Sequence, residues 1–419
     1  MGRPCPAKVA AVLRAAVACA ALVVLLAGCG GSEKSSQGSQ ARELVIAVDA
    51  PFSRDSYLGT TIANGVRLAS SNALLTVGGT DYRLRLVRYD NAHSASRAVA
   101  DVRRAVAQHA AAIVSDGTGV DAAWKIADRA HVPICIVFDG GTGLVDPAKR
   151  PNVFRIAPTD HGIAFRFAEY LIPKKLKVAF LTDDTGYGRE GLAALDHAFS
   201  QNRDSVAARI QTPSTATDLA PQILQARRSG ATALLVWGQP SAIAEAVIAA
   251  RSSGWNVPVY APPSAEDPLL RQELAGHPKW LDGLVFASGR MTAEEGPAPF
   301  MAFQSAYEQL FGAQRVGVRS AAGRPVVQPP DYAMYPFDFT HLVIAAIQAA
   351  KSTDSAKVLA ALNEVSIEGA NGDSRGFNRI NHEGVVDDDV YFARFEGMTY
   401  TPVKDDQLSA TLPVIPQER

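Results

Sequence analysis

Short apolar segments alternate with longer segments of helical periodicity along most of this chain, and this alternation restricts the folds open to it. The first run has expected strands at 44–48, 82–89, 111–114 and 132–137, and expected helices at 57–75, 94–109 and 120–130. Strands that alternate with helices of this length are typical of parallel sheets covered on both faces. The first run therefore predicts one α/β unit.

The same rhythm restarts after a break at residues 152–158. The second run has expected helices at 163–171, 190–199, 219–228 and 242–252, and expected strands at 177–181, 233–237 and 257–260. A chain of 419 residues is too long for one compact core, so two runs predict two doubly wound lobes. The last third predicts helices at 297–311, 337–350 and 355–363, an irregular loop at 312–330, and a strand at 390–395.

The N-terminus has the pattern of an export signal. Three basic residues precede an apolar run at 15–26, and these are Arg3, Lys8 and Arg14. The run is shorter than the roughly 20 residues that span a membrane, and it fits the apolar core of a signal peptide. Residues 1–28 are therefore predicted to be a signal peptide.

The apolar run ends in Leu26-Ala27-Gly28-Cys29, which resembles the lipobox of bacterial lipoproteins. The resemblance implies that Cys29 is acylated and becomes the first residue of the mature chain. Residues 29–42 are mostly small and polar, and they are predicted to be a flexible tether between the lipid and the folded part. The alternative is a plain secretory signal in which Cys29 is incidental.

Charge and cysteine content exclude several classes of protein. Lys and Arg number 41 against 42 Asp and Glu, so nothing indicates a nucleic-acid partner, which would require a basic surface. Once the signal is removed, Cys135 is the only thiol of the folded part, so no internal disulfide is expected. Cys135 lies in an apolar strand and is expected to be a buried, unreactive side chain.

No motif predicts catalysis, a cofactor or a metal. Gly186–Gly191 has G-x-G-x-x-G spacing, but no acidic residue at a strand end about 20 residues later completes a dinucleotide fingerprint. The eight His residues are scattered, without an H-E-x-x-H motif. Asp387, Asp388 and Asp389 are consecutive, so they cannot all face one ion. The protein is expected not to be an enzyme.

Several short motifs occur in an order that resembles one family. They are Leu44–Val48 followed by Pro51-Phe52-Ser53 and Tyr57-Leu58-Gly59, then Tyr89-Asp90-Asn91, Leu181–Asp184 with Tyr187-Gly188, and Tyr335–Asp338 before an Ala-rich helix. With the lipobox and the two α/β runs, they resemble the type I periplasmic binding proteins. The most similar group is the leucine/isoleucine/valine-type substrate-binding lipoproteins of ABC transporters.

The resemblance implies an α/β fold of two doubly wound parallel-sheet lobes joined by a hinge. It implies a first lobe of residues 43–155 and 287–372 and a second lobe of residues 156–286 and 373–419. In this family the lobes close on a ligand held between them. The implied function is capture of a small polar ligand, with branched-chain and other amino acids as candidates, and its delivery to an ABC permease.

The implied location is the extracytoplasmic face of the bacterial cell membrane, where the lipid anchor would hold the protein. A ligand-sensing receptor of the same fold, which signals to a membrane partner, is the alternative function. No cofactor, metal or nucleic acid is expected, and the protein is expected to be a monomer, since binding proteins of this kind must open and close freely.

The resemblance also implies binding residues. The loop Ser115, Asp116, Gly117, Thr118 and Gly119 would hold a ligand carboxylate. Asp139 and Gly140 belong to a second loop of the first lobe, where the family's usual Ser-Ala-Thr character is replaced. Tyr57 and Tyr187 would form the aromatic walls, and Trp237 and Gln239 end a strand from which a side chain of the second lobe reaches the ligand.

One departure from the family bears on the class of ligand. Amino-acid binders place an acidic residue after the strand that corresponds to 257–260, where it pairs with the ligand's ammonium group, but this chain has Pro263 there. Burying an ammonium group without a carboxylate partner costs roughly several kcal/mol of binding free energy. Glu266 and Asp267 are candidates to replace the missing acid from a different backbone position, as are Asp116 and Asp139. The identity of the ligand stays open.

Overall fold

The structure is a computed structural model that describes residues 41–71, 73–288, 299–386 and 390–403. All the described elements belong to one compact unit, which begins at Ala41. The expected signal peptide, Cys29 and Asp387–Asp389 lie outside the described residues, as does most of the expected tether. Among the described helices, none combines the length and the apolar character needed to cross a membrane.

The first sheet has six strands in the order β2-β3-β1-β4-β5-β6, and all neighbours are parallel except the hairpin β2–β3. The strands are β1 (Arg42–Ala50), β2 (Leu74–Val77), β3 (Thr80–Asp90), β4 (Ala112–Ser115), β5 (Ile134–Ile136) and β6 (Val153–Arg155). The helices that follow its strands are α1 (Ser56–Ser70), α2 (Ala95–Ala107) and α3 (Val120–Asp128).

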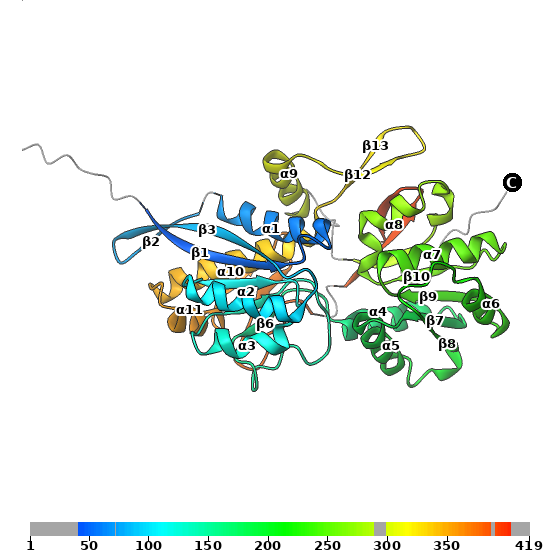
Figure 1. Ribbon diagram of the computed structural model, residues 1–419, viewed down its shortest axis with the longest axis horizontal. Coiled ribbons are helices and arrows are strands. Elements are labelled where there is room, and N and C mark those ends of the chain that lie inside the picture. The colour runs from blue at the N-terminus through cyan, green and yellow to red at the C-terminus, as the bar shows by residue number, and fades with distance from the viewer. Residues whose placement is uncertain (1–40, 72, 289–298, 387–389, 404–419) are drawn as a thin grey trace, which may run out of the picture. The chain divides into compact units, whose positions relative to one another are not determined.

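The buried residues of β1 alternate between the two faces of this sheet, as a strand covered on both sides requires. Val45 and Ala47 pack with α2 and α3, whereas Ile46 and Val48 pack with α1 and the long helix α10 (Asp331–Ala350). In Figure 1, α1 lies above β1, and α2 and α3 lie below it.

The second sheet has seven strands in the order β17-β16-β11-β10-β9-β7-β8. The strands β7 (Val178–Asp183), β8 (Val206–Thr212), β9 (Ala233–Trp237), β10 (Val259–Ala261) and β11 (Val285–Ser288) are parallel, and β16 (Tyr391–Glu396) and β17 (Thr399–Val403) add antiparallel strands at one edge. Residues of α4 (Asp160–Leu171) and α5 (Gly186–Ala198) share one core with this sheet. The other face packs with α6 (Ala220–Arg228), α7 (Pro240–Ser252) and α8 (Pro268–Glu273).

The remaining elements complete the two lobes, each defined as one sheet with the elements packed on it. They are α9 (Pro299–Phe311), the hairpin β12 (Gln314–Arg319) and β13 (Pro325–Gln328), α11 (Ser355–Leu362), the hairpin β14 (Ser366–Glu368) and β15 (Ser374–Gly376), and the short 3₁₀ segments η1 (Arg203–Ser205), η2 (Pro263–Glu266) and η3 (Pro278–Leu281). The expected α/β class with two parallel-dominated lobes is confirmed.

Three expectations about local structure are wrong. The helix expected at 57–75 ends at Ser70, because Leu74–Val77 pairs with β3 across a turn in which Gly78 and Gly79 have positive φ. The irregular loop expected at 312–330 contains the hairpin β12–β13, which buries Val316 and Val326.

The third concerns α10, which begins at Asp331 rather than at residue 337 and continues through Pro336. Beyond the proline, Thr340 Oγ1 donates to the Pro336 carbonyl oxygen (2.7 Å), one turn further along the helix. This early start matters for function, because it places Asp331, Tyr332 and Tyr335 on an ordered helical turn.

The lobe boundaries expected from the sequence remain predictions, but two contacts bear on them. Ser288 lies in β11 and pairs with Tyr391 of β16, within the second sheet. His382 Nδ1 lies 2.9 Å from the Val153 carbonyl oxygen of β6, within the first sheet. A first lobe that extends past residue 373, to about residue 384, fits these contacts better than the expected division.

The crossing of α1 and α10 generates a test of the core. A Cβ at Gly65 would lie 2.3 Å from the Ala333 carbonyl oxygen and 2.7 Å from Pro336 Cγ. Gly65→Ala is therefore expected to lower the free energy of unfolding by about 1–3 kcal/mol, despite the better helix propensity of Ala.

Urea denaturation of residues 41–419 measures this change. Gly276→Ala is the matched control, because a Cβ there meets no atom within 4 Å and φ is not positive. The control is expected to change stability by less than about 0.5 kcal/mol. Equal stability of the two variants would contradict the close crossing of α1 and α10.

Candidate ligand-binding site

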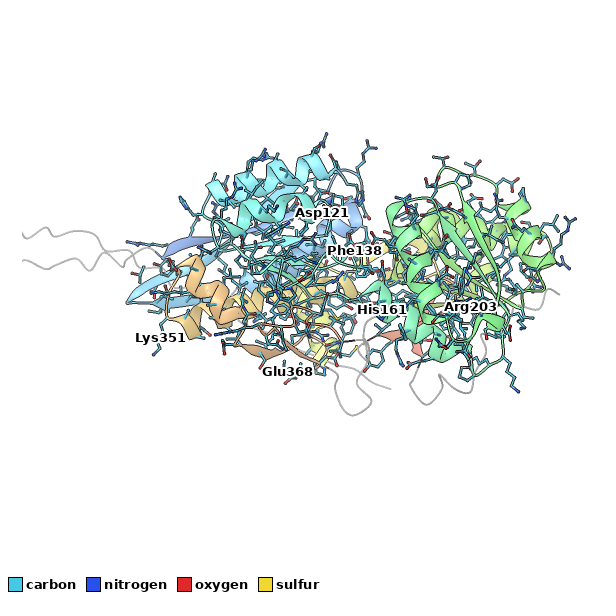
Figure 2. The ribbon with its side chains drawn as sticks, turned by 90° about the horizontal axis from the view of Figure 1, so that it is seen from below. Asp121, Phe138, His161, Arg203, Lys351 and Glu368 are labelled. Carbon is cyan, nitrogen blue, oxygen red and sulfur yellow. The ribbon has the colours of Figure 1, made fainter. Side chains whose placement is uncertain are left out.

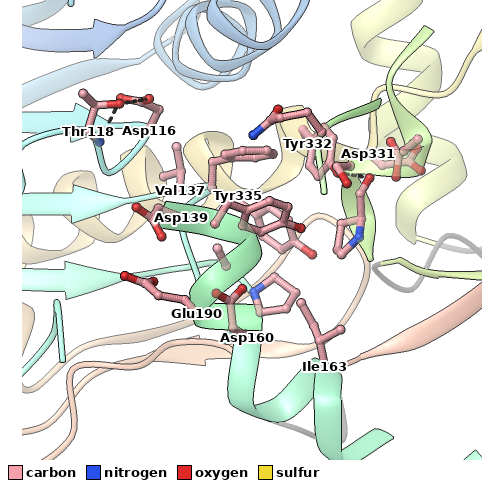
Figure 3. Close-up of a pocket in the computed structure, with 18 of the residues that line it drawn as sticks. Asp116, Thr118, Val137, Asp139, Asp160, Ile163, Glu190, Asp331, Tyr332 and Tyr335 are labelled. Atoms are coloured by element: carbon pink, nitrogen blue, oxygen red, sulfur yellow. Dashed lines mark hydrogen bonds between the residues drawn. The ribbon is translucent and has the colours of Figure 1, made fainter. Parts of the chain in front are cut away.

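A pocket of about 260 Å³ lies where the carboxyl ends of both sets of parallel strands meet. The described residues that line it come from both lobes: Asp116 follows β4, Asp139 follows β5, and Tyr187 and Glu190 lie in the first turns of α5 after β7. Ligands of open α/β sheets bind at this edge, because the strand ends and the helix N-termini present polar groups there. The location is therefore that of a ligand site, and Figure 3 shows part of its lining.

The lining is rich in acids. Six carboxylates line the pocket: Asp116, Asp139, Asp160, Glu190, Glu266 and Asp331. Among the described lining residues, His93 is the one side chain able to carry a positive charge, and its Nδ1 lies 3.9 Å from Asp116 Oδ2. The site is therefore strongly negative whenever these carboxyl groups are ionised.

Asp139, Asp160 and Glu190 form one group on one side of the pocket, here termed the acidic cluster (Figure 3). Asp160, the first residue of α4, is 2% exposed, and its Oδ2 has no hydrogen-bond partner. Burial raises the pKa of Asp160 to about 8, and the charges of Asp139 and Glu190 contribute to this rise. Burial also raises the pKa values of Asp139 and Glu190.

Arg155 of β6 supports this cluster from behind. Its Nη1 donates to the carbonyl oxygens of Asp139 (2.9 Å) and Gly141 (3.0 Å), and its Nε and Nη2 bind the two carboxylate oxygens of Glu383 (2.8 Å each). The guanidinium is thus engaged with the backbone and with Glu383. It fixes the loop that carries Asp139, while the Asp139 carboxylate accepts from the Gly141 N–H (2.8 Å).

The loop after β4 holds a carboxylate of its own chain. Asp116 accepts from Thr118 Oγ1 (2.6 Å), from the Thr118 N–H (3.3 Å) and from Asn91 Nδ2 (2.8 Å). The Gly117 N–H donates to Ser115 Oγ (3.1 Å). Three donors of this loop, the Thr118 hydroxyl, the Thr118 N–H and the Gly117 N–H, are therefore already engaged within the protein.

A second acidic pair lies on the other side of the aromatic residues. Glu266 of η2 accepts from Gln328 Nε2 (3.3 Å) and from Ser288 Oγ (3.5 Å), and Arg271 Nη2 donates to the Glu266 carbonyl oxygen (2.9 Å). Burial raises the pKa of Glu266 well above its usual range and that of Asp331 to about 7. This pair is held by internal partners.

Aromatic side chains separate the two acidic groups. Phe138, Tyr187, Tyr332 and Tyr335 line the pocket, and the Phe138 and Tyr332 rings meet edge to face with centroids 5.3 Å apart. Figure 2 labels Phe138 where the first lobe faces α4 and α5. Such walls suit the apolar part of a ligand or the face of a cationic group.

The structure brings half of the residues expected from the sequence into the lining. Those in the lining are Asp116, Thr118, Asp139, Tyr187, Gln239 and Glu266, and those outside it are Tyr57, Ser115, Gly117, Gly119, Gly140 and Trp237. Trp237 is fully buried beneath Tyr187, with ring centroids 5.9 Å apart, and Tyr57 packs against Tyr332 behind the wall. Asp267 caps α8 and lies outside the lining.

Several lining residues were not expected from the sequence. Asp160 follows Thr159, the N-cap of α4, and a strand–Pro–Thr–Asp sequence was a usable signal for a strand end. Glu190 lies within the Gly-rich segment Gly186–Gly191, whose glycine spacing gave no sign that this side chain lines a pocket. Tyr332 and Tyr335 were not expected, because the helix was predicted to begin only at residue 337.

The described residues give no indication of a metal or of a nucleophile. They contain no group of three or more His, Cys, Asp or Glu side chains arranged to hold a metal ion. Gly372–Gly376 reads G-D-S-R-G, which has the spacing of a nucleophile elbow, but Ser374 lies in the short strand β15 of a hairpin. A nucleophile elbow requires a strand-to-helix turn.

Comparisons with known proteins agree with this geometry. A family model described as "Periplasmic binding protein" matches residues 47–399. A search of curated proteins finds no match. Solved structures match over most of their length at low sequence identity, so their likeness concerns the fold.

A type 1 periplasmic binding protein from Bordetella pertussis Tohama I is 19% identical, with a TM-score of 0.73 over 86% of this chain and 99% of that chain. A leucine binding protein from Thermotoga maritima MSB8 is 19% identical, with a TM-score of 0.71 over 86% and 98%. A solute binding protein of an ABC transporter from Rhodopseudomonas palustris BisB5, in complex with 3,4-dihydroxybenzoic acid, is 19% identical, with a TM-score of 0.68 over 85% and 95%.

The acidic cluster predicts a pH dependence of stability. A folded-state pKa of about 8 for Asp160, against 3.8 in the unfolded chain, means that the native state binds its proton more tightly. The free energy of unfolding should therefore fall as pH rises from about 4 to about 8. Asp160→Asn should remove part of this fall, so that at pH 9 the variant is about 1–3 kcal/mol more stable than the wild type.

Urea denaturation of ligand-free residues 41–419 at pH 5 and pH 9 measures the difference. Other buried acids contribute in the same direction, among them Asp49 and Asp331, so some fall should remain in the variant. Asp204→Asn, at an exposed position, is the control and should keep the wild-type profile. An unchanged pH profile in Asp160→Asn would contradict this electrostatic environment.

Proposed function

Because the chain belongs to the periplasmic binding protein family and has its type I fold, we propose that it is an extracytoplasmic solute-binding protein of an ABC importer. It captures a small polar ligand between its two lobes and releases it to a membrane permease. The observation that carries this proposal is the pocket at the carboxyl ends of both sets of parallel strands, lined from both lobes. Its action is reversible binding, without covalent chemistry.

The solved relatives support small-molecule capture as the common activity. One is named a leucine binding protein, and another was solved with 3,4-dihydroxybenzoic acid. A zwitterion and an aromatic acid differ in charge, so the fold is compatible with ligands of different classes. The side chains of this pocket, rather than the fold, must therefore select the ligand.

We include in the proposal that the protein is a monomer and is anchored to the outer face of the cell membrane through Cys29. Leu26-Ala27-Gly28-Cys29 and the polar segment that follows support the anchor. Several acyl chains on one cysteine bind a membrane far more firmly than a single chain does. The tether would then leave the lobes free to close near a permease.

A capture experiment tests ligand binding without assuming which compound binds. Residues 41–419 are dialysed against a mixture of metabolites, and compounds enriched on the protein side are identified by mass spectrometry. At least one compound should be enriched, approaching one molecule per protein. Tyr187→Ala should weaken its binding at least about tenfold, through loss of an aromatic wall.

Ile380→Ala is the control for the loss of a large side chain, because Ile380 is 89% exposed and outside the pocket. Circular dichroism of each variant verifies that it is folded. A mixture with no enriched compound, or equal enrichment by Tyr187→Ala, would contradict ligand capture in this pocket.

The anchor has its own test. The full chain, expressed in a lipoprotein-processing bacterium, should incorporate labelled fatty acid and fractionate with membranes. Cys29→Ser should abolish the label and release the protein from the membrane fraction. Labelling that persists in Cys29→Ser, or a wild-type chain without label, would contradict acylation of Cys29.

A further inference from the structure

The anion-binding loop of the first lobe is already filled by the protein's own carboxylate. Asp116 accepts from Thr118 Oγ1 and the Thr118 N–H of this loop and from Asn91 Nδ2 after β3, three donors that a ligand carboxylate could otherwise use. A ligand carboxylate placed beside Asp116 would face this buried carboxylate, with the Thr118 and Gly117 donors of the loop already engaged. Bringing two carboxylates together in a buried site is strongly unfavourable while both are ionised.

The neighbouring cations are also engaged. Arg155 binds Glu383 and two backbone carbonyl oxygens. The described lining contains no Lys or Arg. His93 is the one described lining side chain able to carry a positive charge, and it already lies beside Asp116, with Nδ1 3.9 Å from Asp116 Oδ2.

The acidic cluster, in contrast, contains a carboxylate oxygen that can accept a further hydrogen bond. Asp160 is 2% exposed and lines the pocket, and its Oδ2 has no hydrogen-bond partner. A buried carboxylate oxygen without a partner is costly, and such atoms are rare in native structures. A donor supplied by a bound ligand would satisfy it.

Two glycines make room for this cluster. A Cβ at Gly140 would lie 2.5 Å from Asp160 Oδ1, and a Cβ at Gly141 would lie 2.4 Å from Glu190 Oε2. Any side chain at either position would displace one of the carboxylates. The Gly140-Gly141 pair therefore lets the carboxylates of three different segments approach one another.

The size and surroundings of the site favour an organic cation over a metal ion. No group of acids among the described residues is arranged to hold a metal. The pocket of about 260 Å³ also has aromatic walls, including Phe138 and Tyr335. Aromatic faces with nearby carboxylates suit an ammonium or guanidinium group attached to an apolar chain.

We infer that the ligand is an organic cation, which presents an ammonium or guanidinium group to Asp139, Asp160 and Glu190 and carries no carboxylate on the side of Asp116. This inference rests on the proposed function and names its class of ligand. It excludes zwitterionic amino acids, which would place a carboxylate where the loop after β4 holds its own.

Thermal unfolding of residues 41–419 at pH 8 tests the inference with defined probes. The cations are n-butylammonium, butane-1,4-diamine and butylguanidinium, each at 10 mM, and sodium chloride at equal ionic strength is the reference. L-Leucine and 3,4-dihydroxybenzoate are the zwitterionic and anionic probes. At least one cation should raise Tm by several degrees, whereas leucine and dihydroxybenzoate should not.

Variants connect the shift to the acidic cluster. Asp160→Asn combined with Glu190→Gln should reduce the cation-dependent shift at least fivefold while keeping the protein folded. The exposed control Asp204→Asn should keep the full shift.

Three outcomes would overturn the inference. They are no shift with any cation, a cation shift that is undiminished in the double variant, and a shift with leucine or dihydroxybenzoate that exceeds the shift with every cation. The third outcome leaves capture of a solute standing and removes only its cationic class. The dialysis experiment assesses capture independently, because it makes no assumption about charge.

Discussion

The guanidinium of Arg155 fixes the position of the site within the fold. It is 2% exposed and joins β6, the loop after β5, and Glu383 in the segment that precedes the return of the chain to the second sheet. A buried cation needs several partners to offset its desolvation, and here two partners are backbone carbonyl oxygens. The loop that carries Asp139 is therefore fixed by the same interaction that holds the returning segment against the first sheet. Without Arg155, neither the loop nor Glu383 would have a compensating charge.

The site contains several buried acids, and burying them lowers the stability of the ligand-free fold. The pKa of Asp49, beneath the loop after β4, is raised to about 9 by burial and by the charge of Asp116. Burial likewise raises the pKa of Glu266 well above its usual range and the pKa of Asp331 to about 7. Proteins accept such costs at functional sites, where binding compensates for them. A ligand that binds only the folded state then adds its own stabilisation by mass action.

In open α/β sheets ligands bind at the carboxyl ends of the strands, and this tendency explains which parts of the site could be predicted. Asp116 and Asp139 directly follow apolar strands, so their place at the carboxyl edge followed from the sequence alone. Glu190 and Tyr335 lie on the helices α5 and α10, and only the folded structure brings both side chains to the pocket. Trp237 has the same sequence signal as Asp116, yet it is buried, because this tendency does not indicate which face of a strand end is covered.

The rest of the fold could be predicted where local patterns agree with tertiary packing. The alternation of strands and helices gave the two lobes and their class. The helix expected at 57–75 failed because Leu74 and Leu75 have helical spacing but pair with Arg83 and Tyr82, a contact that no local pattern records. The hairpin β12–β13 was not predicted for a similar reason. Its Gly and Pro residues indicated a loop, although its two short strands pair and bury valines.

The carboxylate of Asp116 also governs which solutes can compete for the site. An anion-binding loop with free donors could also take up inorganic or organic anions from the surroundings. An anion that enters this site must first displace a side chain that is covalently part of the protein and is therefore present at a very high effective concentration. Asp116 thus competes with any anion for the Thr118 donors of this loop. If the protein captures a solute as proposed, background anions would then compete poorly with the true ligand for this site.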